Sequence, residues 1–300
     1  MDAFKVHDQL IRDYRSFTIY GKKRMLPLYE AKMLHHYDHR WATYQGMHIR
    51  DVTLDEKQDP NFVVLPRYWV SELEVDERLV DRWDRDWLLG WRDICRSTDE
   101  RTMIASLSPL AAVGHKMPLA FCDKGALLNA IFSSFAFDFF ARQKVGGTSM
   151  AYFIINQLPV PEPSFFDTPA PWFTERSIFD WMEPRILELN FDTRESVSIA
   201  RVLNDHGSPF CWDDERRAVL RAELDATFFC SYGMDRNDIN YVLDTFPIVK
   251  RKDEAKYGDY RTKRLILEVS GRMAEAIRTG KPYQTNLDPL PGQGRRHPAK

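Results

Sequence analysis

Apolar residues in the first half of the chain form short runs separated by polar breaks, a pattern that predicts strands joined by turns. We expect a strand pair over residues 61–71 that is interrupted at Pro66, a strand over 87–95, and another over 102–107 ahead of Pro109. The opening differs, because its apolar residues between Phe4 and Phe17 fall near helical spacing. It is therefore interpreted as an amphipathic extension over residues 1–24.

The most apolar run of the chain covers residues 125–141, where four polar residues interrupt it (Asn129, Ser133, Ser134 and Asp138). It is shorter than the roughly 20 residues that a bilayer span needs, so it predicts a buried helix and no membrane partner. A basic turn with Arg142 and Lys144 and a Gly146-Gly147-Thr148 loop follow. Residues 157–161 are expected to close this block as a strand.

Beyond the proline-rich stretch 162–175, the spacing of apolar residues becomes helical. Helices are expected over 174–190, 196–203, 213–232, 238–246 and 253–279. The predicted fold class is therefore α+β, a β-rich domain over residues 25–163 followed by an all-helical domain over 164–280. The tail 281–300 is rich in proline and glycine, and we expect it to be loose.

The overall charge gives little guidance to function, since the formal net charge is −2. Any contact with nucleic acid must therefore come from a local basic face. The four cysteines are far apart with no CxxC pair, and the charged opening has no apolar signal core. Both features are typical of a cytoplasmic protein with reduced thiols.

Basic residues of the first half supply candidate DNA contacts. Arginine can bond guanine in two places, and lysine mainly neutralises phosphate. Gly146 and Gly147 allow two interpretations: a tight turn with positive φ, or a close backbone approach to a phosphate, with Thr148 donating a hydrogen bond. The candidate DNA-binding residues are Arg92, Arg101, Lys116, Arg142, Lys144, Gly146, Gly147 and Thr148.

Several patches in a fixed order carry a family resemblance. They are the run from Pro27 to Arg40, the run from Arg92 to Pro118, the helix–GGT–LPVP block and the later run from Phe246 to Asp253. Together they resemble the C-terminal, target-recognition half of large type II restriction-modification adenine-N6 DNA methyltransferases. The first 22 or so residues resemble the start of a helicase-like protein. The resemblance implies a module that recognises double-stranded DNA, with a methyltransferase or helicase subunit as a further partner.

The catalytic motifs of that family do not occur in this sequence. An adenine methylase needs a glycine-rich turn for S-adenosylmethionine and an Asn/Asp-Pro-Pro-Tyr/Phe tetrapeptide that holds the flipped base. The nearest string, residues 59–62, has Asn61 where the second proline belongs. The resemblance therefore implies a catalytically incomplete chain without a cofactor of its own, and S-adenosylmethionine is expected only on a partner or a missing domain.

Two other functions stay open at this point. Glu30 and Lys32 match the last half of a PD-(D/E)xK nuclease signature, and the nearby histidines (His35, His36 and His39) could ligate a metal if a helix placed His35 and His39 on one face. This alternative is a metal-dependent DNA nuclease. The third is an interaction module whose helical half docks a methylase or helicase subunit.

Overall fold

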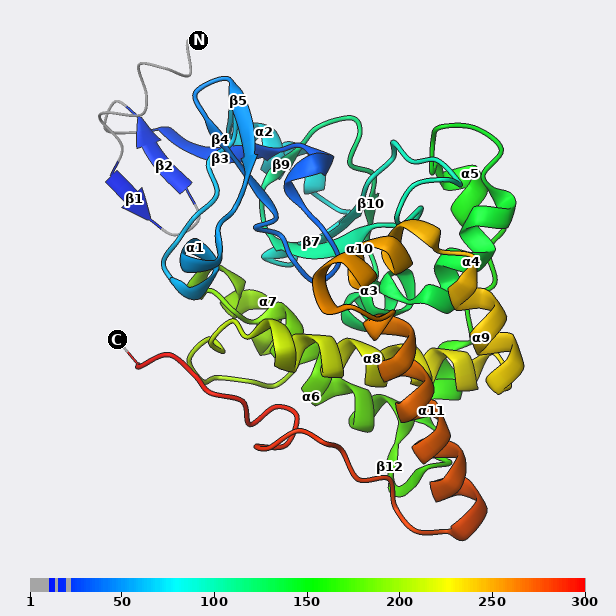
Figure 1. The fold of residues 1–300 in the computed structure, drawn as a ribbon. Helices are drawn as coiled ribbons and strands as arrows, with labels where there is room; N and C mark the ends of the chain where they lie inside the picture. The colour runs from blue at the N-terminus through cyan, green and yellow to red at the C-terminus, as the bar shows by residue number, and fades with distance from the viewer. Residues whose placement is uncertain (1–10, 14–15, 20–22, 300) are drawn as a thin grey trace.

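The computed structural model describes residues 11–13, 16–19 and 23–299, and it has the α+β architecture that the sequence predicts (Figure 1). Small sheets and short helices form the N-terminal part. From Ile178 onward, helices dominate the described chain, and a short hairpin precedes them within the part expected to be all-helical.

The strands form four small sheets. In the first sheet, antiparallel pairing runs in the order β1 (Ile11–Asp13), β2 (Ser16–Ile19), β3 (Lys23–Tyr29) and β6 (Trp69–Ser71). A fifth strand, β9 (Ala112–Val113), pairs with β3 in parallel. A second sheet contains β10 (Leu119–Ala120), β7 (Trp87–Trp91) and β8 (Ala105–Pro109). Two hairpins pair β4 (Ala42–Gln45) with β5 (His48–Asp51) and β11 (Pro169–Ala170) with β12 (Phe173–Ser177).

The longest described helices all lie in the second half of the chain. The first half has α1 (Leu54–Gln58), α2 (Glu72–Leu79), α3 (Gly125–Ser133) and α4 (Phe135–Lys144). The second has α5 (Tyr152–Ile155), α6 (Ile178–Asn190), α7 (Val197–Val202), α8 (Asp214–Ser231), α9 (Arg236–Asp244), α10 (Pro247–Tyr257) and α11 (Arg261–Thr279). The described residues also form 3-10 turns at Ala31–Met33, Pro163–Asp167 and Arg194–Ser196.

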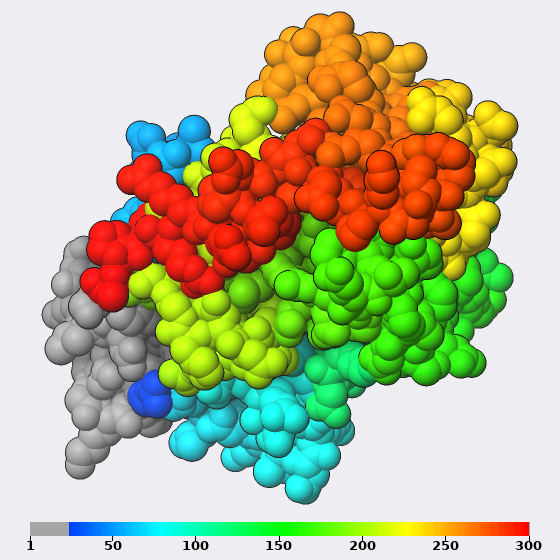
Figure 2. Space-filling model, turned by 90° about the horizontal axis from the view of Figure 1, so that it is seen from below, coloured from blue at the N-terminus to red at the C-terminus, as the bar shows by residue number. Residues whose placement is uncertain are grey.

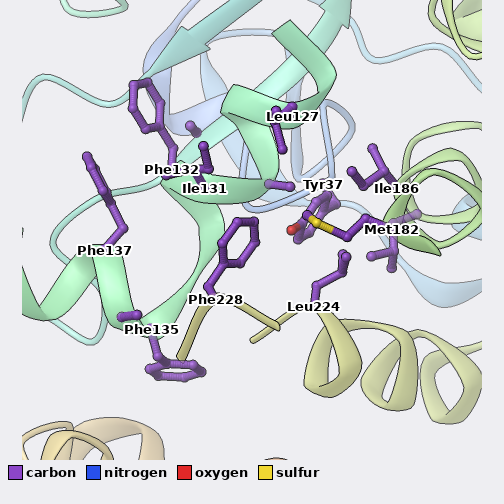
Figure 3. Close-up of a cluster of buried hydrophobic side chains, with 14 of the residues drawn as sticks. Tyr37, Leu127, Ile131, Phe132, Phe135, Phe137, Met182, Ile186, Leu224 and Phe228 are labelled. Atoms are coloured by element: carbon purple, nitrogen blue, oxygen red, sulfur yellow. The ribbon is translucent and has the colours of Figure 1, made fainter. Parts of the chain in front are cut away.

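One large hydrophobic cluster joins the two halves. It contains buried side chains of β7 and β8, of α3 and α4, and of α6, α8 and α11. Figure 3 shows Tyr37 pointing into this cluster close to Met182 of α6, with Leu127 of α3 nearby. Since an apolar helix face is stabilised by burial against neighbours, the apolar run 125–141 is explained by its central place in the core.

The apolar run 125–141 is divided into two helices at Ser134, which ends α3 with an extended backbone. Its hydroxyl then accepts a hydrogen bond from the amide of Phe137 and caps α4. The next turn of α4 carries the buried carboxylate of Asp138, which faces the segment leading into β8. A polar residue that interrupts the apolar pattern is therefore a structural anchor here.

Two strand predictions are confirmed and others are wrong. The strands expected over 87–95 and 102–107 are present with shifted bounds, as Trp87–Trp91 and Ala105–Pro109, and the second includes Pro109. Residues 157–161 form turns and irregular backbone instead of a strand, and within 61–71 only β6 is a strand. The extension 1–24 lies mostly outside the described residues, but its described parts, β1 and β2, are strands rather than helix.

The predicted helix over 253–279 is in fact two helices. Gly258 adopts a left-handed conformation, with φ 79°, and ends α10. The chain then reverses, and the Asp253 carboxylate accepts a hydrogen bond of 2.6 Å from the Thr262 amide at the start of α11. Periodicity alone did not reveal this break, because apolar spacing resumes at once in α11.

The tail from Lys281 has irregular backbone but is packed, contrary to the expected loose segment. Tyr283 is buried beside Trp181, and its hydroxyl donates to Glu223 at 2.8 Å. Farther along, Arg296 pairs with Asp205. Figure 2 shows the tail as a continuous red band lying across the surface. Among the described helices, none has the length and apolarity to cross a bilayer.

Candidate nucleic-acid interface

The loop with Gly146, Gly147 and Thr148 is exposed between two buried anchors, Val145 and Met150. Neither glycine has a positive φ, so the tight-turn interpretation is wrong. A Cβ built on either glycine would meet no atom within 4 Å. The glycines therefore leave a stretch of backbone uncovered by protein, which is the geometry that a phosphate contact needs.

Asp93, two residues after the end of β7, holds this loop in place. Its carbonyl accepts from the Met150 amide at 2.7 Å, and its carboxylate accepts from the Ser149 hydroxyl. The other carboxylate oxygen accepts from Lys116 Nζ at 2.8 Å. Burial acts to raise the pKa of Asp93, but the hydrogen bonds from Lys116 and Ser149 outweigh it and keep that pKa below its ordinary value.

A second connection joins the loop to the turn after Asp93. The amide of Cys95 donates to the Thr148 carbonyl at 3.2 Å, and Ile94 pairs with Ser149 as an isolated bridge. The turn itself is closed by the Asp99 carboxylate, which accepts from the Arg96 amide at 2.8 Å. Arg96, whose side chain is exposed, therefore follows directly on the residue that bonds the loop.

The candidate arginines lie inside the protein rather than on this surface. Arg101 is 8 % exposed and pairs with Asp138 at 2.6 Å, and Arg142, also 8 % exposed, donates to the carbonyls of Thr245 and Glu100. Arg92 is partly buried and donates twice to the Leu34 carbonyl. The geometry thus gives these three guanidinium groups structural roles and no path to a base edge.

The candidate lysines remain available. Lys116 is half exposed although it bonds Asp93, and Lys144 is exposed with no hydrogen bond or ion pair to any described residue. We use the name GGT face for the surface formed by Arg96, His115, Lys116, Lys144, residues 146–149 and Tyr152. Of the residues predicted from the sequence, this face brings together Lys116, Lys144, Gly146, Gly147 and Thr148.

A groove of about 730 Å³ opens beside the GGT face. Its walls come from α2, from the segment joining β9 to β10, and from residues 149–152. Arg82, His115 and Tyr152 line it and are exposed. An exposed aromatic ring among cations offers a surface on which a nucleobase can stack.

Sequence reasoning missed several residues of this surface. Asp93 and His115 lie within the patches that carry the resemblance, but nothing in their spacing indicated a positioning role for the former or exposure for the latter. Arg82 and Tyr152 had no signal in the sequence. Arg82 follows α2, which packs against β3 and β6, and Tyr152 of α5 bonds Leu119 of β10, so their contribution follows only from tertiary packing.

The metal and nuclease geometry is not formed. His35 and Asp38 pair as an isolated bridge in a turn, so His35 and His39 do not share a helix face. Asp38 is bound by the buried Lys57 ammonium, while the Glu30 carboxylate accepts from the Tyr44 hydroxyl at 2.6 Å. The part of the chain that the structure describes contains no group of three or more His, Cys, Asp or Glu side chains placed to hold a metal.

No family model, curated protein or solved structure matches this chain.

Proposed function

We propose that the chain is a DNA-recognition module that binds duplex DNA through the GGT face. It would serve an adenine-N6 methylation or restriction system, with methyl transfer and S-adenosylmethionine left to another polypeptide or domain. The observation that carries the proposal is the uncovered loop backbone, which Asp93 fixes beside two accessible lysines. Backbone amides and lysines are groups that position a protein on phosphates.

Phosphate contacts do not distinguish one DNA sequence from another, so side chains that can contact bases are also needed. Arg82 lines the groove beside the GGT face and Arg96 lies outside that groove; both are exposed, and neither side chain makes an ion pair with a described residue. A free guanidinium can bond two acceptors of guanine in the major groove. We assign base reading to these two arginines, because the candidate arginines Arg92, Arg101 and Arg142 are held by bonds within the protein.

The first prediction concerns the two lysines. The double variant Lys116→Gln/Lys144→Gln should bind a fluorescent duplex pool more weakly, by roughly tenfold per lysine at about 0.1 M salt, because each contact releases about one counterion. The slope of log Kd against log salt should fall by about two. Fluorescence anisotropy over a salt series measures both quantities.

Two further variants make this test specific. Lys116→Arg keeps the charge beside Asp93 and should bind nearly as the unchanged protein does. Lys281→Gln removes an exposed lysine at the far end of α11 and should have no effect. An unchanged salt slope in the double variant would contradict the assignment of the GGT face, and no binding of the unchanged protein at low salt would favour the interaction-module alternative.

A further inference from the structure

A second cavity, of about 270 Å³, lies where the two halves of the chain meet. Residues 35–37, the junction of α3 with α4, α8, and the facing ends of α10 and α11 form its walls. Its lining is apolar over α8 and α11, where Ala222, Phe228 and Ile266 contribute. An apolar cavity with a few polar groups at one end is typical of a small-molecule site.

His36 is the polar group that the surrounding protein leaves unsatisfied. It is 5 % exposed, and neither of its ring nitrogens has a hydrogen-bond partner among the described residues. Burial first, and then the charges of Arg101 and Arg221, lower the pKa of His36 well below its ordinary value. The ring is therefore neutral, with one N–H donor and one acceptor, and leaving both unpaired in a buried place is unfavourable.

Two more polar groups lie at the same end of the cavity. The Asp225 carboxylate accepts from the Phe135 amide at 2.7 Å through one oxygen, and burial raises its pKa to about 6. Ser133 Oγ lies near the Tyr37 hydroxyl but makes no well-directed hydrogen bond. With His36, these groups form an array of hydrogen-bond donors and acceptors.

The other end of the cavity is exposed and carries charges of both signs, since Arg221, Lys256, Asp214 and Asp253 line it. Arg221 is exposed and makes no ion pair with the described part of the chain, and Lys256 lies 5.0 Å from the ring centre of Tyr257. His35 lies between the two ends, and after burial the charges that lower its pKa are those of Arg92, Arg221, Arg101 and Lys252. Arg221 therefore offers an accessible cation to an anionic substituent.

We propose that this cavity binds one nucleotide unit, with the uncharged edge of its base at His36 and its phosphate toward Arg221. A nucleobase combines a flat apolar body with a donor and acceptor edge, which matches the apolar walls and the inner polar end. The nucleotide is either a free mononucleotide or one that has left the stack of a bound DNA strand. The second of these, a nucleotide from a bound DNA strand, rests on the proposed function.

The cavity and the GGT face share one structural element. Glu100 lines the cavity, while Cys95, five residues earlier in the same turn, bonds the Thr148 carbonyl of the loop. A strand held on the GGT face would therefore lie next to the turn that borders the cavity. This arrangement favours a single nucleotide unit over an unrelated small molecule.

Binding of free nucleotides is tested by calorimetry with each of the four deoxynucleoside monophosphates, the matching nucleosides and deoxyribose phosphate. We expect at least one monophosphate to bind, deoxyribose phosphate to fail, and His36→Phe to weaken binding at least tenfold. Arg221→Gln alters an exposed side chain, so the protein should fold, and it should weaken the monophosphate about tenfold but leave the nucleoside unchanged. Ser270→Ala, which removes an unpartnered hydroxyl outside the cavity, is the control.

The strand source is tested with duplexes that carry 2-aminopurine, whose fluorescence rises when it leaves the stack. An unstacked nucleotide is supported if 2-aminopurine fluorescence rises with the unchanged protein and does not rise with His36→Phe. Anisotropy must show that the variant still binds the DNA. A free nucleotide is supported if a monophosphate binds and the fluorescence of 2-aminopurine in the duplex does not change. The proposal is overturned if neither signal appears, or if both variants bind as the unchanged protein does. Since His36 is not part of the GGT face, failure here leaves the lysine test intact.

Discussion

Replacing Asp138 with alanine is expected to lower the free energy of unfolding by about 3–5 kcal/mol. This fully buried carboxylate pairs with Arg101 at 2.6 Å and also accepts from the amides of Thr102 and Met103. Its removal leaves a buried guanidinium and two amide donors without their acceptor, and such losses are among the most destabilising single changes. Urea unfolding followed by tryptophan fluorescence measures the effect.

A matched control and a double variant identify the cause. Asp167→Ala removes an exposed carboxylate and should change the unfolding free energy by less than about 0.5 kcal/mol. Arg101→Met combined with Asp138→Ala should recover part of the loss, because no unpaired charge then stays buried. A loss below about 1 kcal/mol for Asp138→Ala alone would show that the pair does not hold α4 to the segment before β8.

The second large expected effect is a gain in stability. Asp225→Asn should raise the free energy of unfolding above pH 6, by up to about 3 kcal/mol, because burial raises the pKa of Asp225 from 3.8 to about 6. A carboxyl group with a raised folded pKa holds its proton more tightly when folded. It therefore destabilises the fold progressively as pH rises from about 4 to 6, and asparagine removes that loss while its oxygen still accepts from Phe135.

The pH dependence separates this effect from simple repacking. Urea unfolding at pH 4.5 and pH 8 should give a small difference between Asp225→Asn and the unchanged protein at the lower pH and the full difference at the higher one. Asp167→Asn should differ little from the unchanged protein at either pH. An equal gain at both values would mean that the buried charge of Asp225 is not its source. A stability gain on removal of this carboxylate would fit a group retained for binding rather than for folding.

Regular elements were predictable where one local signal dominates. The strand at Trp87–Trp91 is a run of large apolar residues, and α8 has acidic residues in its first turn with Asp213 as its cap. Both appear within a few residues of the expected bounds. The opening segment failed because apolar spacing near 3.6 over a short stretch also fits strands whose pairing partner, β3, lies farther along the chain.

The candidate site was predictable only in part, since a sequence does not show which cations are exposed. Arg101 and Arg142 bond groups that are distant in the sequence. Arg101 bonds the Asp138 carboxylate, 37 residues away, and Arg142 bonds the Thr245 carbonyl, 103 residues away. The lysines kept their predicted exposure, as expected of a strongly hydrated ammonium group. Local composition carries no signal for the cavity at His36, because its walls come from segments far apart in the chain.

The packed tail has a consequence for biosynthesis. Tyr283 fills a position beside Trp181 and caps the buried Glu223, which also pairs with Arg185. During translation Glu223 is made 60 residues before Tyr283, so the helical half leaves the ribosome before this part of its core is complete. A stalled or prematurely terminated chain would expose those tryptophan rings, which makes it a substrate for chaperones and proteases.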